Sequence, residues 1–208
     1  MSSVIASYNY AVWPAQIPAY GLALALLWIA IRGGNGRVAT RLTGTTLAAA
    51  WAWTGAVFHA QYFATVDFMA PVYGVLFLLQ ALLLAWAGII RGRIAPHLHD
   101  GPVSWAGLAL IAHAIVGYPA ITAVIGDGVA NARVVGLAPG PTVVFTLGML
   151  MLARDRTPLH LAAVPVLWSL IAGVTAWVLG VAEEAVLPLL GLGSLALMLW
   201  KNGRRRAA

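Results

Sequence analysis

The chain has 208 residues, of which 62% are hydrophobic and only 9% are charged, with a formal net charge of +6. Soluble domains usually carry about 25% charged residues, so this composition excludes an ordinary soluble domain and predicts an all-α bundle that uses the lipid bilayer as its solvent. A nucleic-acid-binding protein is also excluded, because the basic residues lie in short clusters between apolar runs and form no continuous stripe.

Seven apolar runs, bounded by Gly, Pro and charged residues, predict seven transmembrane helices. One span with its connection takes about 25–30 residues, which leaves no room for a domain outside the membrane, so we interpret residues 1–208 as a single membrane domain. In chain order the predicted spans are about 11–31, 43–63, 71–90, 104–125, 139–153, 159–180 and 185–200. The fifth and seventh runs are short, and the fifth has a re-entrant segment as its alternative.

The basic residues predict the orientation of the chain, because Lys and Arg prefer cytoplasmic loops. They follow the first, third, fifth and seventh runs as Arg32, Arg37, Arg41, Arg91, Arg93, Arg154, Arg156, Lys201, Arg204, Arg205 and Arg206. With seven spans all of them share one side, while Arg133, Asp67, Asp127, Glu183 and Glu184 fall on the other. We therefore expect the N-terminus outside and the C-terminus in the cytoplasm, with a first run that is retained as a helix and not removed as a signal peptide.

Several kinds of chemistry find no support in the sequence. Cysteine is absent, which excludes disulfides, a thiolate nucleophile and Cys-ligated metals. No metalloprotease, phosphate-loop or nucleophile-elbow motif is present. The pair His97 and His99, with Asp100, favours a solvated loop over a metal site. The sequence thus predicts no catalytic residue, no metal and no cofactor, and an enzyme is the less favoured class.

Polar side chains at membrane depth are the strongest indication of a functional site, because lipid cannot satisfy them. Counting 1.5 Å per residue from the span ends gives a midplane layer and an outer layer of such residues. Trp51 and His59 share one face of the second run at helical spacing. If the polar faces converge, they line an outward-facing cavity formed by Trp13, Trp51, His59, Gln80, His113 and Ser169, with Glu183 and Glu184 at its mouth.

Each candidate also has a structural interpretation, and the sequence leaves both open. Gln80, His113 and Ser169 could instead form hydrogen bonds between helices. Trp51 is either packing or cavity wall, and the two glutamates are either loop acids or part of the site. If His113 is functional, its ordinary pKa of about 6.5 would allow it to couple transport to a proton.

Six stretches of the chain carry a resemblance to a known family. They are YNYAVWPAQIPAY at 8–20, the run from Trp53 through GAVFHAQYF at 55–63, LFLLQALLLAWAGIIRGR at 76–93, GYP at 117–119, GLAPGPTVVFTLG at 136–148 and VPVLWSLIAGVTAWVLGVAEE at 164–184. Their order and spacing resemble a family of uncharacterised bacterial multi-pass membrane proteins, number 6064 among the domains of unknown function. The resemblance implies a multi-pass protein of the bacterial inner membrane, and it carries no activity or catalytic residue with it.

Three functional hypotheses follow from these observations. The first is a small permease or solute-binding membrane protein with a small-molecule ligand in the outward cavity. The second is an accessory or scaffolding subunit whose polar residues only hold helices together. The third is a metal or haem protein, or a membrane enzyme, that uses His59 or His113. The bilayer is the partner that the sequence predicts, and it indicates no particular protein partner.

Overall fold

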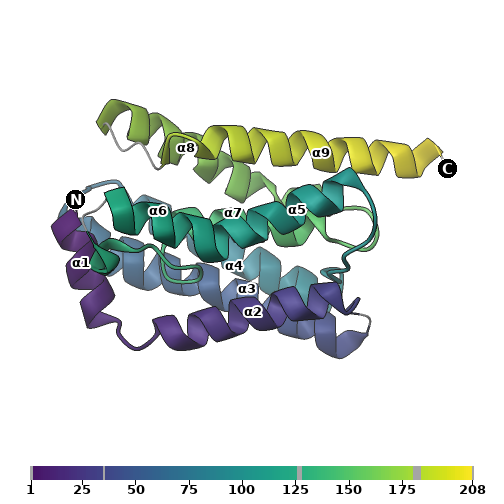
Figure 1. Cartoon of the computed structure of the whole chain (residues 1–208), viewed down its shortest axis with the longest axis horizontal. Coiled ribbons are helices and arrows are strands. Elements are labelled where there is room, and N and C mark those ends of the chain that lie inside the picture. The colour runs from purple at the N-terminus through teal and green to yellow at the C-terminus, as the bar shows by residue number, and fades with distance from the viewer. Residues whose placement is uncertain (1, 35, 126–127, 180–183, 208) are drawn as a thin grey trace.

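The computed structural model describes residues 2–34, 36–125, 128–179 and 184–207 (Figure 1). The chain is 79% helical and has no strand within these ranges. The one extended pairing among the described residues is an isolated bridge between Pro96 and Ala153. The predicted all-α fold is therefore confirmed.

The helices follow one another with short connections, and several α-helices continue directly into π-helical turns. In chain order they are α1 (Ser2–Ala11), α2 (Gln16–Ile31), α3 (Arg37–Trp53), η1 (Thr54–Tyr62), η2 (Phe63–Thr65), α4 (Ala70–Ala85), η3 (Trp86–Ile90), α5 (Pro102–Ala112), η4 (His113–Gly117), α6 (Tyr118–Ile125), η5 (Val129–Asn131), α7 (Pro139–Met151), η6 (Leu159–Leu161), α8 (Ala163–Leu179) and α9 (Leu187–Ala207). Of these, η1, η3 and η4 are π-helical, and η2, η5 and η6 are short 3-10 turns.

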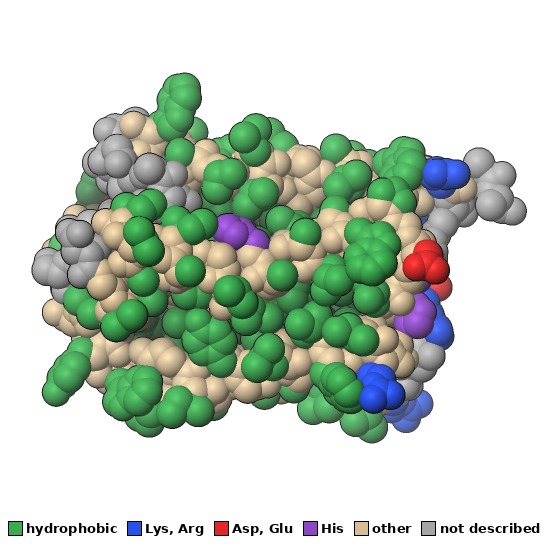
Figure 2. Space-filling view, viewed as in Figure 1, with side chains coloured by type: hydrophobic (Ala, Val, Ile, Leu, Met, Phe, Trp, Pro, Cys, Tyr) green, Lys and Arg blue, Asp and Glu red, His purple; other side chains and the backbone are tan. Residues whose placement is uncertain are grey.

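Successive helices run back and forth between two ends of the bundle. At one end the Leu98 N–H donates to the Ala30 oxygen at 2.8 Å, and the His97 N–H donates to the Leu152 oxygen at 2.8 Å. The Lys201 ammonium also reaches the Met151 oxygen there, at 3.0 Å. The end of α2 and the connections 91–101 and 152–160 therefore lie at the same end as the last turns of α9. Figure 2 shows Lys and Arg side chains gathered at this end. We call it the basic end.

The opposite end is closed by α1 and the segment that precedes α7. The Tyr8 hydroxyl donates to the Leu137 oxygen at 2.7 Å, and the Asn9 amide donates to the Ala132 oxygen at 2.8 Å. The first run, predicted as a helix over about 11–31, begins only at Gln16 as α2 and is preceded by a separate helix, α1, which meets α2 at 85°. Pro14 lies in the turn between them and has no N–H to continue a helix. Figure 1 shows α1 running across the end of the bundle.

Glycines allow the closest helix contacts in the bundle. A Cβ at Gly44 of α3 would lie 2.6 Å from the Gly88 Cα of η3, and a Cβ at Gly107 of α5 would lie 2.9 Å from the Gly148 oxygen of α7. Small residues at such crossings let two backbones approach closely and gain van der Waals contact. They fix the α3–α4 and α5–α7 pairs in antiparallel contact.

The helix α7 forms the centre of the bundle. All 13 of its residues are buried, and it packs against α5, α8 and α9. Its Thr146 hydroxyl accepts a hydrogen bond from the Trp51 indole N–H at 2.8 Å, which ties α7 to α3. The hydrophobic core therefore surrounds a helix that has no face of its own on the outer surface.

The expectation of seven spans is met only in part. Three helical stretches are long and apolar enough to cross a membrane, Ala70–Ile90, Pro102–Ile125 and Leu159–Trp177, and a fourth results if α1 and α2 count as one bent span. The predicted spans 43–63, 139–153 and 185–200 do not reach this standard. The first of them carries polar side chains such as His59, the second is α7 with only 13 residues, and the third continues into the basic tail of α9.

Candidate functional site

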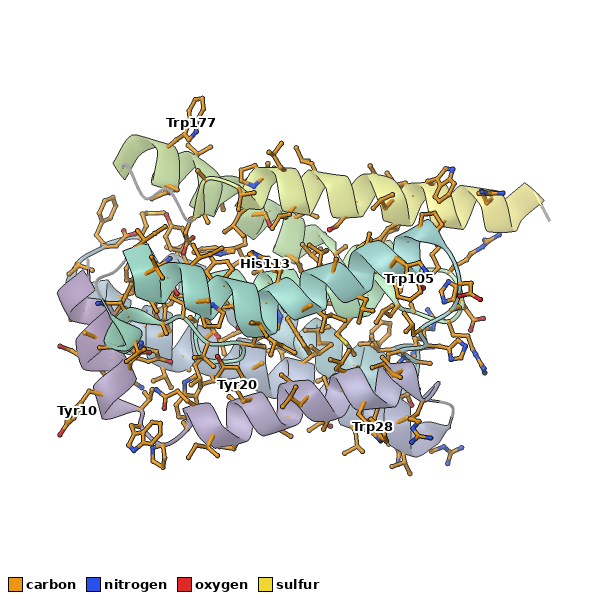
Figure 3. All side chains as sticks on the ribbon, viewed as in Figure 1. Tyr10, Tyr20, Trp28, Trp105, His113 and Trp177 are labelled. Carbon is orange, nitrogen blue, oxygen red and sulfur yellow. The ribbon has the colours of Figure 1, made fainter. Side chains whose placement is uncertain are left out.

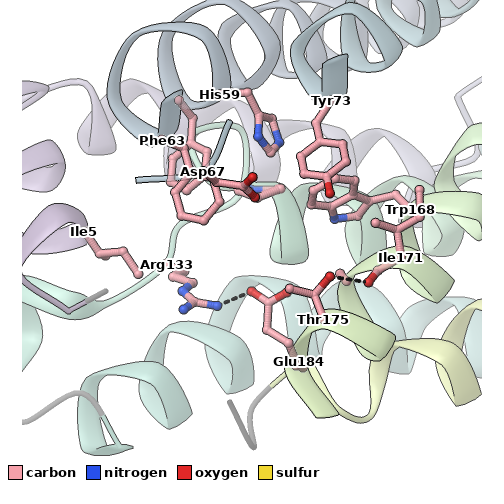
Figure 4. Close-up of a pocket in the computed structure, with 14 residues that line it drawn as sticks. Ile5, His59, Phe63, Asp67, Tyr73, Arg133, Trp168, Ile171, Thr175 and Glu184 are labelled. Atoms are coloured by element: carbon pink, nitrogen blue, oxygen red, sulfur yellow. Dashed lines mark hydrogen bonds and ion pairs between the residues drawn. The ribbon is translucent and has the colours of Figure 1, made fainter. Parts of the chain in front are cut away.

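The main candidate site is a cavity that lies toward the end opposite the basic end and extends inward to His59 (Figure 4). Its walls come from α1, η1, the connection before α4, α4 itself and α8, and it contains about 600 Å³, counting the part that is open to the outside. We call it the His59 cavity. The side chains that matter for its chemistry are His59, Asp67, Tyr73, Arg133, Trp168 and Glu184.

His59 lies at the inner part of this cavity and is surrounded by aromatic rings. It sits in η1 and is fully buried. Its ring centroid lies 4.8 Å from that of Phe77 and 5.0 Å from that of Trp168, and the Phe58, Phe63 and Tyr73 rings complete the enclosure. π-Helical turns inside α-helices are frequent at functional sites, and here such a turn carries the buried imidazole.

The polar atoms of His59 and Trp168 are not satisfied by the part of the chain that the structure describes. His59 Nδ1, His59 Nε2 and Trp168 Nε1 are all buried, and within the described ranges none has a hydrogen-bond partner. More than nine-tenths of buried polar groups in proteins are paired, and leaving one unpaired costs about 1–3 kcal/mol. Two neighbouring rings with unused polar atoms, beside an open cavity, can supply a donor and an acceptor to a bound molecule.

The mouth of the cavity carries charged side chains from three separate connections. Arg133 and Glu184 form an ion pair there, and both side chains are largely buried. Asp67 lies on the same cavity wall, where its carboxylate also accepts the Met69 N–H at 2.8 Å (Figure 4). Charge at the entrance and aromatic rings at the base give the cavity a polar end and an apolar end.

The structure brings His59 and Glu184 together in this cavity but assigns Trp51, Gln80 and Ser169 to helix packing. Trp51 is fully buried against Phe77 and bonded to Thr146. The Gln80 amide donates to the Leu161 oxygen at 2.8 Å, and the Ser169 hydroxyl donates to the Pro165 oxygen of its own helix at 2.8 Å. None of these three side chains lines the His59 cavity.

The remaining predicted site residues lie elsewhere. Trp13 is 63% exposed in the turn between α1 and α2. His113 lies in η4, is half-buried and packs on Tyr118, and Figure 3 shows it near the middle of the bundle's length. Neither lines the His59 cavity. Glu183, and likewise Asp127 of the predicted outer loop, fall outside the described residues.

Sequence reasoning missed four residues of the cavity, which are Asp67, Tyr73, Arg133 and Trp168. Trp168 lies within an apolar run, where tryptophan is common, so its residue type does not indicate a functional role. Asp67 and Arg133 were recognised only as loop charges on the outer side. Their predicted position on the same side of the membrane could have indicated the site, because opposite charges in neighbouring loops can pair across the end of a bundle.

The histidine pair at the basic end makes its contacts within the chain. The His97 and His99 rings lie parallel, with centroids 6.2 Å apart, and the Ser104 hydroxyl contacts the His99 ring at 3.0 Å. Among the residues that the structure describes, no group of three or more His, Cys, Asp or Glu side chains could hold a metal ion.

Fold and site together define a class, an all-helical bundle with three or four candidate membrane spans and an aromatic cavity at one end. The sequence profile of the family of unknown function DUF6064 matches residues 2–208, so the chain belongs to that family, as the resemblance indicated. No curated protein and no solved structure matches the chain.

Proposed function

We propose that this chain is an integral membrane protein that binds a small organic solute in the His59 cavity, as a small permease or a solute-binding protein. The observation that carries the proposal is the pair of His59 and Trp168, whose three buried nitrogens have no partner in the described chain beside an open cavity. A solute that pairs with these atoms would recover the free energy that their burial costs.

The membrane part of the proposal rests on the apolar helices and on the basic end. Three Arg side chains lie over Trp rings at that end, as Arg32 on Trp28, Arg91 on Trp86 and Arg204 on Trp200. Trp is enriched at the membrane–water interface, and Lys and Arg at its cytoplasmic side. The proposed protein therefore has its basic end in the cytoplasm and the mouth of the His59 cavity outside, in a bacterial inner membrane.

The proposal extends to the helices that are too short or too polar to qualify as spans alone. They pack directly against the three apolar stretches, and α7 is enclosed by its neighbours. A bundle that buries such a helix removes it from contact with lipid, so its short apolar length carries no penalty there. On this basis the seven segments cross together.

The chemistry of the cavity indicates the kind of solute. Ligand pockets are usually apolar with a few placed polar groups, and the lining of the His59 cavity has this character. Phe63 and Ile171 offer an apolar wall, and the inner nitrogens offer hydrogen bonds. We expect a ring or short alkyl body that carries one hydroxyl, carbonyl or amine.

The experiment is a binding screen on the purified full chain with its matched variants. The probes are phenol, benzamide, benzoate and benzylamine, which share one ring and differ in the polar group, and the readout is the thermal unfolding midpoint together with equilibrium dialysis. Trp168→Phe is expected to weaken binding about tenfold, the effect of one lost hydrogen bond of about 1.4 kcal/mol. Trp177→Phe on the same helix, 84% exposed and directed away from the bundle (Figure 3), is the control and should leave binding unchanged. If no probe binds, or if both variants bind equally well, the solute-binding proposal fails.

A second candidate, an accessory subunit, is favoured by His113. This side chain is half-buried near the middle of the bundle's length (Figure 3), between the exposed Val116 and the buried Ile111. A polar side chain at that depth is costly in lipid, and a second protein that covers it would remove the cost. Stoichiometric co-purification of a partner that is lost on His113→Phe would support this function, and a protein that purifies alone with both sequences would contradict it.

A further inference from the structure

A second cavity lies at the basic end, and none of its lining residues lines the His59 cavity. It opens between the connection that follows η3 and the connection that follows α7, and it contains about 1010 Å³, counting its open part. Its lining contains the side chains of Arg93, Arg154 and Arg156, together with His160 and the carboxylate of Asp155. We call it the arginine pocket.

The backbone that carries these arginines is fixed by contacts between distant segments. The Arg154 N–H donates to the Ala95 oxygen at 3.0 Å, directly beside the bridge between Pro96 and Ala153. The Thr157 N–H donates to Asn202 Oδ1 at 2.8 Å, and the Asn202 amide returns a bond to the Thr157 oxygen at 2.9 Å. Both connections and the end of α9 are thus held together, so the backbone that carries the exposed arginines of the pocket is fixed.

The pocket stands at the level where a lipid headgroup would lie. Arg91 covers the Trp86 ring at 4.8 Å, and this pair directly precedes Gly92 in the pocket wall. Trp rings are typical of the membrane–water interface. Ile90, in the same turn, is 73% exposed. An apolar surface therefore begins right beside the cationic pocket, as a molecule with an anionic head and an acyl chain would require.

We propose that the arginine pocket binds a phosphate group, supplied by the headgroup of an anionic phospholipid of the cytoplasmic leaflet. The guanidinium fork matches phosphate oxygens with paired hydrogen bonds, and basic pockets between helices on the cytoplasmic side suit lipid phosphates. The inference is independent of solute binding, because no residue of the arginine pocket lines the His59 cavity.

The test measures lipid binding to the purified full chain in a neutral detergent. Phosphatidylglycerol and phosphatidylcholine with the same acyl chains are added in separate titrations, and inorganic phosphate is added in a third. Bound lipid is counted by native mass spectrometry, and the thermal unfolding midpoint is recorded in parallel. The variant is Arg154→Gln with Arg156→Gln, and the control is Arg37→Gln with Arg41→Gln. The control removes two positive charges from exposed positions at the same end, outside the pocket.

We expect phosphatidylglycerol to bind and to raise the unfolding midpoint more than phosphatidylcholine does. The pocket variant should bind it about tenfold more weakly, and the control variant should bind it like the original chain. Inorganic phosphate could raise the unfolding midpoint of the original chain in the same way and fail to do so in the pocket variant. The pocket would then bind phosphate from a soluble molecule, and the proposal that a lipid supplies it would be wrong. An equal loss of lipid binding in the pocket and control variants, or no binding of any probe, would overturn the proposal that the arginine pocket binds phosphate. If the double variant does not fold, Arg93→Gln decides by the same comparison.

Discussion

The Trp168 indole meets the His59 imidazole at a centroid distance of 5.0 Å and an interplanar angle of 72°, and neither ring uses its nitrogens within the described chain. Elsewhere in the bundle a buried indole is satisfied, since Trp51 donates to Thr146. Trp51 therefore contributes a hydrogen bond that stabilises the fold. Trp168, together with His59, instead leaves buried nitrogen atoms without a partner in the described chain.

This contrast gives opposite expectations for two ring substitutions. His59→Phe should raise the free energy of unfolding by about 1–3 kcal/mol, because it removes buried polar atoms that the described chain leaves unpaired. Trp51→Phe should lower it by about 1–3 kcal/mol, because it leaves the Thr146 hydroxyl without its donor and opens space in the core. Thermal and denaturant unfolding in one detergent measures both. A clear destabilisation by His59→Phe would mean that the imidazole nitrogens are satisfied in the folded protein.

Two glycine substitutions should likewise have opposite signs. Gly44→Ala places a Cβ 2.6 Å from the Gly88 backbone and should destabilise the bundle by about 1–3 kcal/mol, because α3 and η3 must move apart. Gly193→Ala in α9 meets nothing within 4 Å and should be neutral or stabilising by up to about 1 kcal/mol through helix propensity. The same unfolding assay compares them. Equal effects would show that the close approach of α3 and η3 is absent.

Lys201 is a cation of the basic end whose charged group acts inside the structure. Lys201 is buried and donates to the Met151 and Ala153 oxygens at the end of α7, where the helix dipole favours positive charge. Lys201→Met should lower the free energy of unfolding by about 1–3 kcal/mol, since the carbonyls lose their donor. Arg204→Met removes the same charge from an exposed position and should change it by no more than about 0.5 kcal/mol. Similar losses in both variants would assign the effect to net charge instead of capping.

The absence of cysteine makes the proposed orientation directly measurable, because each introduced cysteine is the only one in the chain. Thr65→Cys and Val129→Cys, exposed at the end opposite the basic end, should react with a membrane-impermeant maleimide in intact cells. Arg37→Cys and Asp100→Cys, exposed at the basic end, should react only after the membrane is opened. The reverse pattern would mean that the basic end lies outside the cell. A mixed pattern would show that some segments do not cross the membrane.

The sequence predicted the helical class and one face of the site well, because both depend on local periodicity. Trp51 and His59 were assigned to one face of the second run, and in the structure both rings pack against Phe77 of α4. The two side chains therefore share one face, as the helical spacing predicted. They have different roles, because Trp51 bonds to Thr146 of α7 whereas His59 lines the cavity.

The rest of the site depends on contacts between distant segments, which helical spacing cannot supply. A depth count put Gln80, His113 and Ser169 at one level, but it gives no rotation about the helix axis. Gln80 faces the Leu161 oxygen, Ser169 bonds within its own turn, and His113 lies in another π-helical turn away from the cavity. The separate helix α1 and the later start of α2 were not predicted, since prolines near the start of a helix are usually tolerated.

The complete burial of α7 also bears on how the protein is made. A helix of 13 residues extends only about 20 Å, too short to cross the hydrocarbon layer readily by itself as the chain emerges from the ribosome. In the proposed membrane protein, its insertion would therefore wait for a hydrophobic partner, and α5, which it touches through Gly107 and Gly148, precedes it in the chain. Insertion would then be cooperative at the centre of the bundle. The helix that is too short to cross alone is the one around which its neighbours pack.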